Sequence, residues 1–143
     1  MNEHQEWIPP DVFGRSLRGF GINLLSRSVE AHTSFATSVL GATILYAIAD
    51  FAALQYRDTV WMVHHDRTYG KHPISGFLQA SEARGVGIEL HLYERDPDIA
   101  ERTARLRGDI VLAGAIEKPH GLREVFILDP DGYVWVLSRP IVA

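Results

Sequence analysis

The sequence predicts an α+β fold of two βαβββ modules, each consisting of a strand, a helix and three further strands. The prediction depends on a turn between two apolar strands near the C-terminus, two helices with recognisable caps, and a repeated order of elements. A ferredoxin-like βαββαβ sheet is the weaker alternative, because the chain contains more candidate elements than that sheet uses.

The C-terminal turn is the clearest local signal. Residues Asp129-Pro130-Asp131-Gly132 fit a type I turn, in which proline presets φ at the second position and glycine tolerates positive φ at the fourth. The flanking runs 125–128 and 133–137 consist of β-branched, aromatic and aliphatic residues, which strands favour. The sequence therefore predicts a hairpin at this end of the chain.

Each half of the chain has the same predicted order of elements. In the first half, residues 18–26 form a strand, Ser28 caps a helix that ends at Gly41, and strands follow at 42–48, 51–56 and 59–64. In the second half, residues 86–93 form a strand, Asp96 caps a helix that ends at Gly108, and strands follow at 109–117, 121–128 and 133–139. This repetition indicates an internal duplication.

The domain organisation follows from this order. Residues 1–17 contain Pro9-Pro10 and show no clear period, so we expect an irregular N-terminal arm. A single domain spans residues 18–139, with module 1 at 18–65, a connection at 66–84 and module 2 at 85–139. A connection of that length is often functional.

Composition excludes several classes of function. The 143 residues carry a formal net charge of −4, which gives no basic surface for nucleic acid. The absence of cysteine excludes disulfides and thiolate metal sites. We expect no membrane interaction, since no apolar run is long enough to span a bilayer and the N-terminus lacks the features of a signal peptide. The expected location is the cytoplasm.

Several motifs resemble the vicinal oxygen chelate superfamily, which includes glyoxalases, bleomycin resistance proteins and extradiol dioxygenases. They are Asn23-Leu-Leu-Ser-Arg-Ser-Val-Glu, Val39-Leu40-Gly41-Ala42, Glu89-Leu-His-Leu-Tyr and Asp129-Pro-Asp-Gly. The resemblance implies the glyoxalase/bleomycin resistance-like fold, with cupped, mostly antiparallel sheets around a cavity for a small organic molecule. It also implies a homodimer.

The metal ligands of this superfamily are mostly missing from the matching positions. The resemblance places them at Gly21, His91, Val136 and the last strand of module 1, where Val60 and Met62 are the inward candidates. Histidine alone is a metal-ligand type, and a catalytic divalent ion normally needs at least three protein ligands. We therefore expect no metal cofactor, and a protein that binds a small organic ligand in a metal-free cup.

Alternation along the strands indicates which residues line this cup, because positions i and i+2 share a face. The predicted ligand-binding residues are Asn23, Met62, His64, Glu89, His91, Tyr93 and Val136. Trp135 should face the opposite way, into the core. Tyr69 and His72 in the connection, and His120 before the seventh strand, are placed to cap the cavity.

An enzyme is the alternative interpretation. A divalent-metal-dependent lyase, isomerase or dioxygenase would use a shifted site at His91 and Glu89, with His64 as a third ligand. Without metal, His91 has an imidazole suited to general base catalysis, and Glu89 would orient it. Glu89 could instead pair with an arginine such as Arg123. In a third interpretation the cup is vestigial and the protein is a dimeric scaffold.

Overall fold

The computed structural model describes residues 7–80 and 83–142. Its first half contains α1 (Pro10–Ser16), β1 (Asn23–Ser26), α2 (Val29–Phe35), the π-helical turn η1 (Ala36–Leu40), β2 (Thr43–Ile48), β3 (Phe51–Tyr56) and β4 (Thr59–His65). The connection contains the 3-10 turn η2 (Asp66–Tyr69) and α3 (Ser75–Ala80). The second half contains β5 (Gly85–Tyr93), α4 (Pro97–Arg107), β6 (Val111–Glu117), β7 (Leu122–Leu128) and β8 (Tyr133–Pro140).

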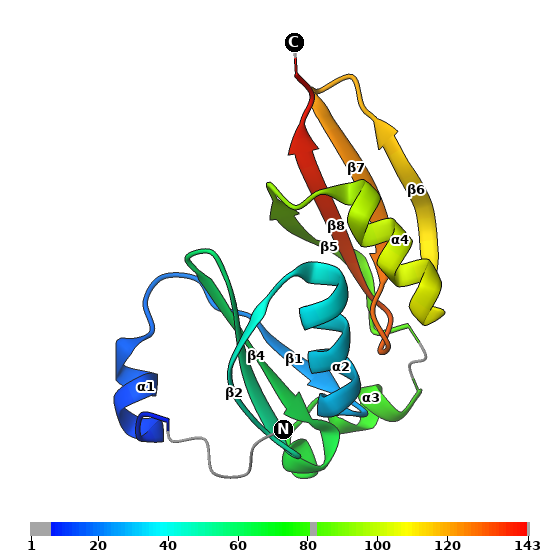
Figure 1. The fold of residues 1–143 in the computed structure, drawn as a ribbon. Helices are drawn as coiled ribbons and strands as arrows, with labels where there is room; N and C mark the ends of the chain where they lie inside the picture. The colour runs from blue at the N-terminus through cyan, green and yellow to red at the C-terminus, as the bar shows by residue number, and fades with distance from the viewer. Residues whose placement is uncertain (1–6, 81–82, 143) are drawn as a thin grey trace.

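The strands form two four-stranded sheets with the same internal order. The first sheet is β1-β4-β3-β2 and the second is β5-β8-β7-β6. In each, the first strand pairs in parallel with the last, and the remaining pairs are antiparallel. Figure 1 shows the two modules as separate units, with α2 against the first sheet and α4 against the second. The predicted α+β fold of two βαβββ modules is confirmed, and the ferredoxin-like alternative is wrong.

The predicted caps and turn have the geometry that their residue types favour. The Ser28 side chain accepts a hydrogen bond from the backbone N–H of Ala31, and the Asp96 side chain caps α4 in the same way. Gly41 and Gly108 end their helices in the left-handed conformation. In the hairpin, the N–H of Gly132 donates to the carbonyl of Asp129 at 3.0 Å, so local chemistry determines these boundaries.

The N-terminal segment differs from the prediction. Residues 10–16 form helix α1 where an irregular arm was expected, and residues 1–6 of that arm lie outside the described residues. Proline at the first helical turn and an ion pair between Asp11 and Arg15 favour this helix. Strand β1 begins at Asn23 instead of residue 18, so Gly21 precedes the strand. Residues 17–22 therefore form a linker between α1 and the first sheet.

The core lies between the sheets and the two long helical segments. Strand residues on the helix-facing side, such as Leu54, Val63, Ile127 and Leu137, are completely buried together with Phe35 of α2. Trp135 is 3% exposed and belongs to this core, as its strand parity predicted. Among the described residues, no helix is long and apolar enough to cross a membrane.

Two buried hydrogen-bonded pairs, one in each module, meet at a close contact between His32 and Asp129. Oδ2 of Asp129 accepts a hydrogen bond from Nε1 of Trp135 at 3.0 Å and lies 3.5 Å from Nδ1 of His32 in α2. Nε2 of His32 in turn accepts a hydrogen bond from Nε1 of Trp61 at 3.2 Å. Because Nε2 accepts this hydrogen bond, Nδ1 is the ring nitrogen on the side of the Asp129 carboxylate that is left to carry a proton.

The neighbouring Asp131 makes a second connection between the modules. Its carboxylate accepts hydrogen bonds from the Ser26 hydroxyl at 2.6 Å and from the Arg27 backbone N–H at 2.9 Å. Asp131 is 2% exposed, and charged acceptors make the stronger class of hydrogen bond. The hairpin turn therefore holds the end of β1 in place.

Arg84 fixes the end of the connection. Its guanidinium donates two hydrogen bonds of 2.6 Å to the two carboxylate oxygens of Asp66, and one of 3.1 Å to the carbonyl of Leu25. The hydrogen bonds from Arg84 hold the pKa of Asp66 below its ordinary value. The same interaction raises the pKa of Arg84. Because only 4% of the Arg84 side chain is exposed, its charge depends on this partner.

Candidate ligand-binding site

A cavity of about 700 Å³ lies between α1 and the face of the first sheet opposite to α2. We call it the arm chamber, because residues of the N-terminal segment line one side of it. Figure 1 shows α1 beside the first sheet. It is lined by Trp7, Ile8, Pro9, Pro10, Phe13, Gly14, Leu17, Asn23, Tyr46, Ile48, Phe51, Met62, His64 and Tyr69.

Strand alternation explains the floor of the arm chamber. In β4, Trp61 and Val63 point into the core, so Met62 and His64 point the other way. The parallel register pairs Asn23 with Met62, and the antiparallel register pairs Phe51 with His64, which places all four on one face. Asn23, Met62 and His64 of the predicted ligand-binding set thus lie in one cavity.

Aromatic rings form the wall nearest to the arm. The Trp7 indole stacks on the Tyr46 ring, with centroids 4.8 Å apart and planes inclined by 6°. Phe13 lies 4.5 Å from the same indole, and Phe51 lies 6.1 Å from it. Offset stacking is a favourable arrangement for such rings, so these contacts hold the arm against the sheet.

Three further polar side chains, Asn23, His64 and Tyr69, line the arm chamber, and we call them its polar corner. His64 packs between the rings of Phe51 and Tyr69, with centroid distances of 5.2 and 5.5 Å. Burial lowers the pKa of His64 below its usual value, so the imidazole is neutral at pH 7. Within the part of the chain that the structure describes, the side chains of Asn23, His64 and Tyr69 have no hydrogen-bond partner.

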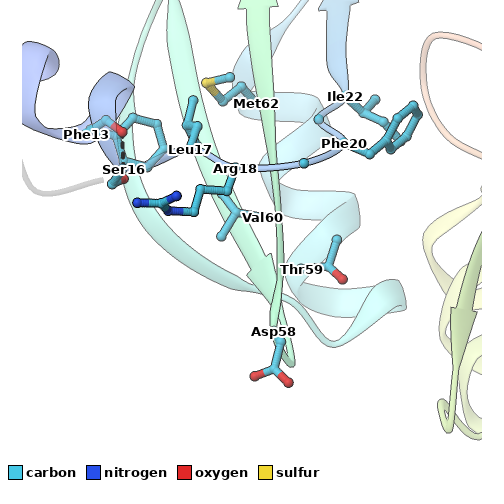
Figure 2. A pocket seen from close by; sticks show the side chains of 12 residues that line it. Phe13, Ser16, Leu17, Arg18, Phe20, Ile22, Asp58, Thr59, Val60 and Met62 are labelled. Carbon is cyan, nitrogen blue, oxygen red and sulfur yellow. Dashed lines mark hydrogen bonds between the residues drawn. The ribbon is translucent and has the colours of Figure 1, made fainter.

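A second cavity of about 440 Å³ continues the arm chamber along the linker before β1. The two share Phe13, Leu17 and Met62 in their walls. Figure 2 shows the Arg18 side chain directed toward Ser16, and Asp58 apart at the far end. Cationic and anionic groups thus lie in this outer groove and not in the arm chamber.

The other predicted site residues lie on the second sheet. Nε2 of His91 is 3.0 Å from Oε1 of Glu89, and the His91 ring stacks on Tyr93 at 5.6 Å. Val136 pairs with His91 in register and is completely buried. Glu89 and His91 border a separate cavity of about 170 Å³. The structure therefore places these residues on one face of the second sheet, outside the arm chamber.

The structure separates the three residues of the alternative metal set. His64 lies in the arm chamber, whereas Glu89 and His91 lie together on the second sheet. Over residues 7–80 and 83–142, no three histidine or carboxylate side chains are close enough to hold a metal ion. Arg123, considered as a partner of Glu89, makes a bidentate pair with Asp98 at 2.8 and 2.9 Å.

The sequence interpretation missed a polar pair on the second sheet. Nε2 of His120 lies 2.7 Å from Oε1 of Glu124, whose carboxylate is buried in β7. By register Glu124 neighbours Ser138, and the buried hydroxyl of Ser138 has no partner among the described residues. Strand alternation could not indicate this pair, because Glu124 lies in β7 whereas His120 lies in the loop before it.

The aromatic wall of the arm chamber was also missed. None of Trp7, Tyr46 and Phe51 was assigned to the cavity from the sequence. Strand parity could have placed Phe51, because it lies opposite His64 in the antiparallel register. Tyr46 lies beside a register irregularity in β2, which interrupts simple alternation.

Comparison with solved structures identifies the fold. A glyoxalase/bleomycin resistance protein/dioxygenase from Nocardioides superposes with a TM-score of 0.64 and 19% sequence identity over 92% of each chain. A glyoxalase-related enzyme from Fulvimarina pelagi gives a TM-score of 0.67 at 20% identity, covering 89% of this chain and 94% of its own. A glyoxalase/bleomycin resistance protein/dioxygenase family enzyme from Burkholderia phytofirmans PsJN gives 0.67 at 17%, covering 84% and 96%.

The sequence alone has no comparable match. No protein-family model and no curated protein sequence matches the chain. Sequence identities of 17–20% are low, so the similarity to these structures lies in the fold. The superposed region covers 84–92% of this chain. The chain therefore has the fold of the glyoxalase/bleomycin resistance/dioxygenase proteins, as the resemblance in its motifs predicted.

Proposed function

We propose that this protein binds a small organic molecule in the arm chamber, without a metal cofactor. The arm chamber carries the proposal, since its volume of about 700 Å³ lies within the ~300–1,000 Å³ usual for small-molecule sites. Its walls are mainly apolar and aromatic, with a few polar groups among them. Such walls supply affinity through burial, and the polar groups orient the ligand.

The fold supports the same proposal. The solved structures with this architecture include a glyoxalase/bleomycin resistance protein/dioxygenase from Nocardioides, and bleomycin and the substrates of glyoxalases are small organic molecules. Of the predicted ligand-binding residues, Asn23, Met62 and His64 would contact the ligand. Glu89, His91, Tyr93 and Val136 lie on the other sheet and are not part of this proposed site.

Two matched tyrosine variants test where the ligand binds. A compound library is screened by thermal shift, and the affinity of each hit is then measured by calorimetry. Tyr46→Ala should weaken binding at least about tenfold, since it removes a stacking surface of the chamber. Tyr93→Ala, on the second sheet, should leave the affinity within about twofold of wild type.

The opposite pattern would move the ligand site to the second sheet. A wild-type protein that binds no compound of a broad library would contradict the proposed function itself, and would favour the scaffold interpretation.

We also propose a homodimer, as the resemblance implies. Apolar side chains at the edges of the second sheet support this, because Val86, Ile88, Leu112 and Ile116 are each more than half exposed. Covering such groups with a second copy of the chain would remove apolar surface from water, which is favourable. Light scattering after size-exclusion chromatography should give twice the mass of 16.0 kDa, and a monomer mass would refute the proposal.

A further inference from the structure

The described residues that line the arm chamber carry no formal charge at pH 7. No aspartate, glutamate, lysine or arginine is among the described residues that line it. His64 is the one titratable base among these residues, and burial keeps it neutral. A charged ligand buried here would lose its hydration without gaining a countercharge, which is strongly unfavourable. The chamber therefore selects against ions.

The aromatic wall favours a flat ring system. The near-parallel stack of Trp7 on Tyr46 demonstrates that this wall accepts a planar bicyclic group, because the indole is such a group. Phe13 and Phe51 surround the same position at 4.5 and 6.1 Å from the indole. A planar aromatic ligand could thus stack beside the Trp7 indole against the same wall.

The polar corner requires a complementary group on the ligand. Asn23 offers an amide, Tyr69 a hydroxyl and His64 a neutral imidazole, and none of them has a hydrogen-bond partner among the described residues. Together they supply both donors and acceptors. A ligand hydroxyl or carbonyl would satisfy them, whereas a pure hydrocarbon would leave them unpaired when it excludes water.

From these three features we propose that the ligand is an uncharged planar aromatic molecule carrying a hydroxyl or carbonyl group. Its ring stacks on the wall formed by Trp7 and Tyr46, and its polar group bonds to the corner formed by Asn23, His64 and Tyr69. This inference rests on the proposed function and adds the chemical class of the ligand.

The test uses three probes with the same ring system: 2-naphthol, naphthalene and 2-naphthoate. 2-Naphthol is an uncharged phenol at pH 7, naphthalene lacks the polar group, and 2-naphthoate is an anion. Calorimetry on the 143-residue chain should give 2-naphthol an affinity at least about tenfold above that of 2-naphthoate, because the anion has no countercharge in the chamber. Naphthalene should bind more weakly than 2-naphthol.

Two variants test the polar corner. Tyr69→Phe and Asn23→Leu each remove one hydrogen-bonding group and should weaken 2-naphthol binding about 3- to 10-fold, while naphthalene binding stays within about twofold. Tyr56→Phe is the matched control, because its hydroxyl bonds to the carbonyl of Tyr93 outside the chamber. It should leave both affinities unchanged.

The possible results separate this inference from the proposed function. If 2-naphthoate binds as tightly as 2-naphthol, the uncharged class is wrong, and Arg18 in the outer groove becomes the next residue to mutate. If Tyr69→Phe and Asn23→Leu bind 2-naphthol like wild type, the recognition by the polar corner is wrong. If Tyr46→Ala weakens the binding of library compounds but none of the three naphthalene-based probes binds, the proposal of an aromatic ligand is wrong and the proposed function stands. If nothing binds, both are wrong.

Discussion

Replacing Asp129 with asparagine should destabilise the protein by removing one specific buried hydrogen bond. Oδ1 of Asp129 accepts from the backbone N–H groups of Asp131 and Tyr133 at 2.9 and 3.0 Å, and Oδ2 accepts from the Trp135 indole. An asparagine can keep its oxygen toward the two backbone groups, but its NH₂ then faces the indole N–H. Two donors would meet in a site that is 5% exposed.

The expected cost follows from the class of the lost bond. A hydrogen bond to a charged acceptor contributes about 1.5–3 kcal/mol, and the unsatisfied indole N–H adds to the loss, so Asp129→Asn should lower the free energy of unfolding by about 2–3 kcal/mol. For a chain of this size that corresponds to a Tm decrease of about 4–12 °C. Urea unfolding followed by circular dichroism measures the loss without depending on tryptophan fluorescence.

A double-mutant cycle with Trp135→Phe tests whether this bond is the cause. Phenylalanine has no N–H, so in that background Asp129→Asn should cost at least about 1 kcal/mol less than in wild type. Equal costs in both backgrounds would refute the reasoning, because the two residues would then contribute independently.

Further predictions concern the connection, the arm and the second sheet. Asp66→Asn should lower the free energy of unfolding by about 2–3 kcal/mol at pH 7, because the buried Arg84 loses its countercharge. The pKa of Asp66 is lowered in the folded state, so the stability that its charge contributes is present above about pH 4 and is lost at lower pH. The difference in urea midpoint between wild type and variant should therefore shrink on acidification. Equal differences at pH 7 and pH 2 would contradict that interpretation. Trp7→Ala should accelerate tryptic cleavage within the arm, because the arm loses its stacking contact with Tyr46. The free energy of unfolding should change by less than about 1 kcal/mol, since this contact lies outside the main core. Unchanged cleavage would show that stacking does not hold the arm. After incubation with divalent metals and dialysis, wild type and His91→Ala should both retain well below about one ion per chain, whereas one ion lost only in the variant would favour the enzyme alternative.

The elements that were predicted correctly are those whose signals are local. Ser28, Asp96 and the turn at 129–132 make hydrogen bonds to groups within three or four residues, so residue type alone indicated the boundary. The duplicated order of elements then determined the topology, because each repeat must form the same parallel pair between its first and last strands.

Helix α1 was missed although part of its signal was present. Pro10 in the first turn, Asp11 after it and the pair with Arg15 favour a helix, but Gly14 and the two adjacent prolines argue against one. Contacts distant in sequence decide the outcome, since Trp7 and Phe13 pack on Tyr46 and Phe51 of the first sheet.

For the candidate site, the sequence indicated which residues share a face of one sheet, but not how the two sheets lie relative to each other. Strand parity indicates which face of its own sheet a residue occupies, and it correctly grouped Asn23 with Met62 and Glu89 with His91. It does not indicate whether two sheets of one chain face a common cavity. The sequence therefore combined into one cup residues that the structure places on two sheets.

The most direct test of the arm chamber is a crystal structure of the protein in complex with 2-naphthol or with the compound from the screen that binds most tightly. The proposed function predicts ligand density between the arm and the first sheet, with its ring against Tyr46 and its polar group toward Asn23, His64 and Tyr69. Density on the second sheet beside Glu89 and His91, with the arm chamber free of ligand, would contradict it.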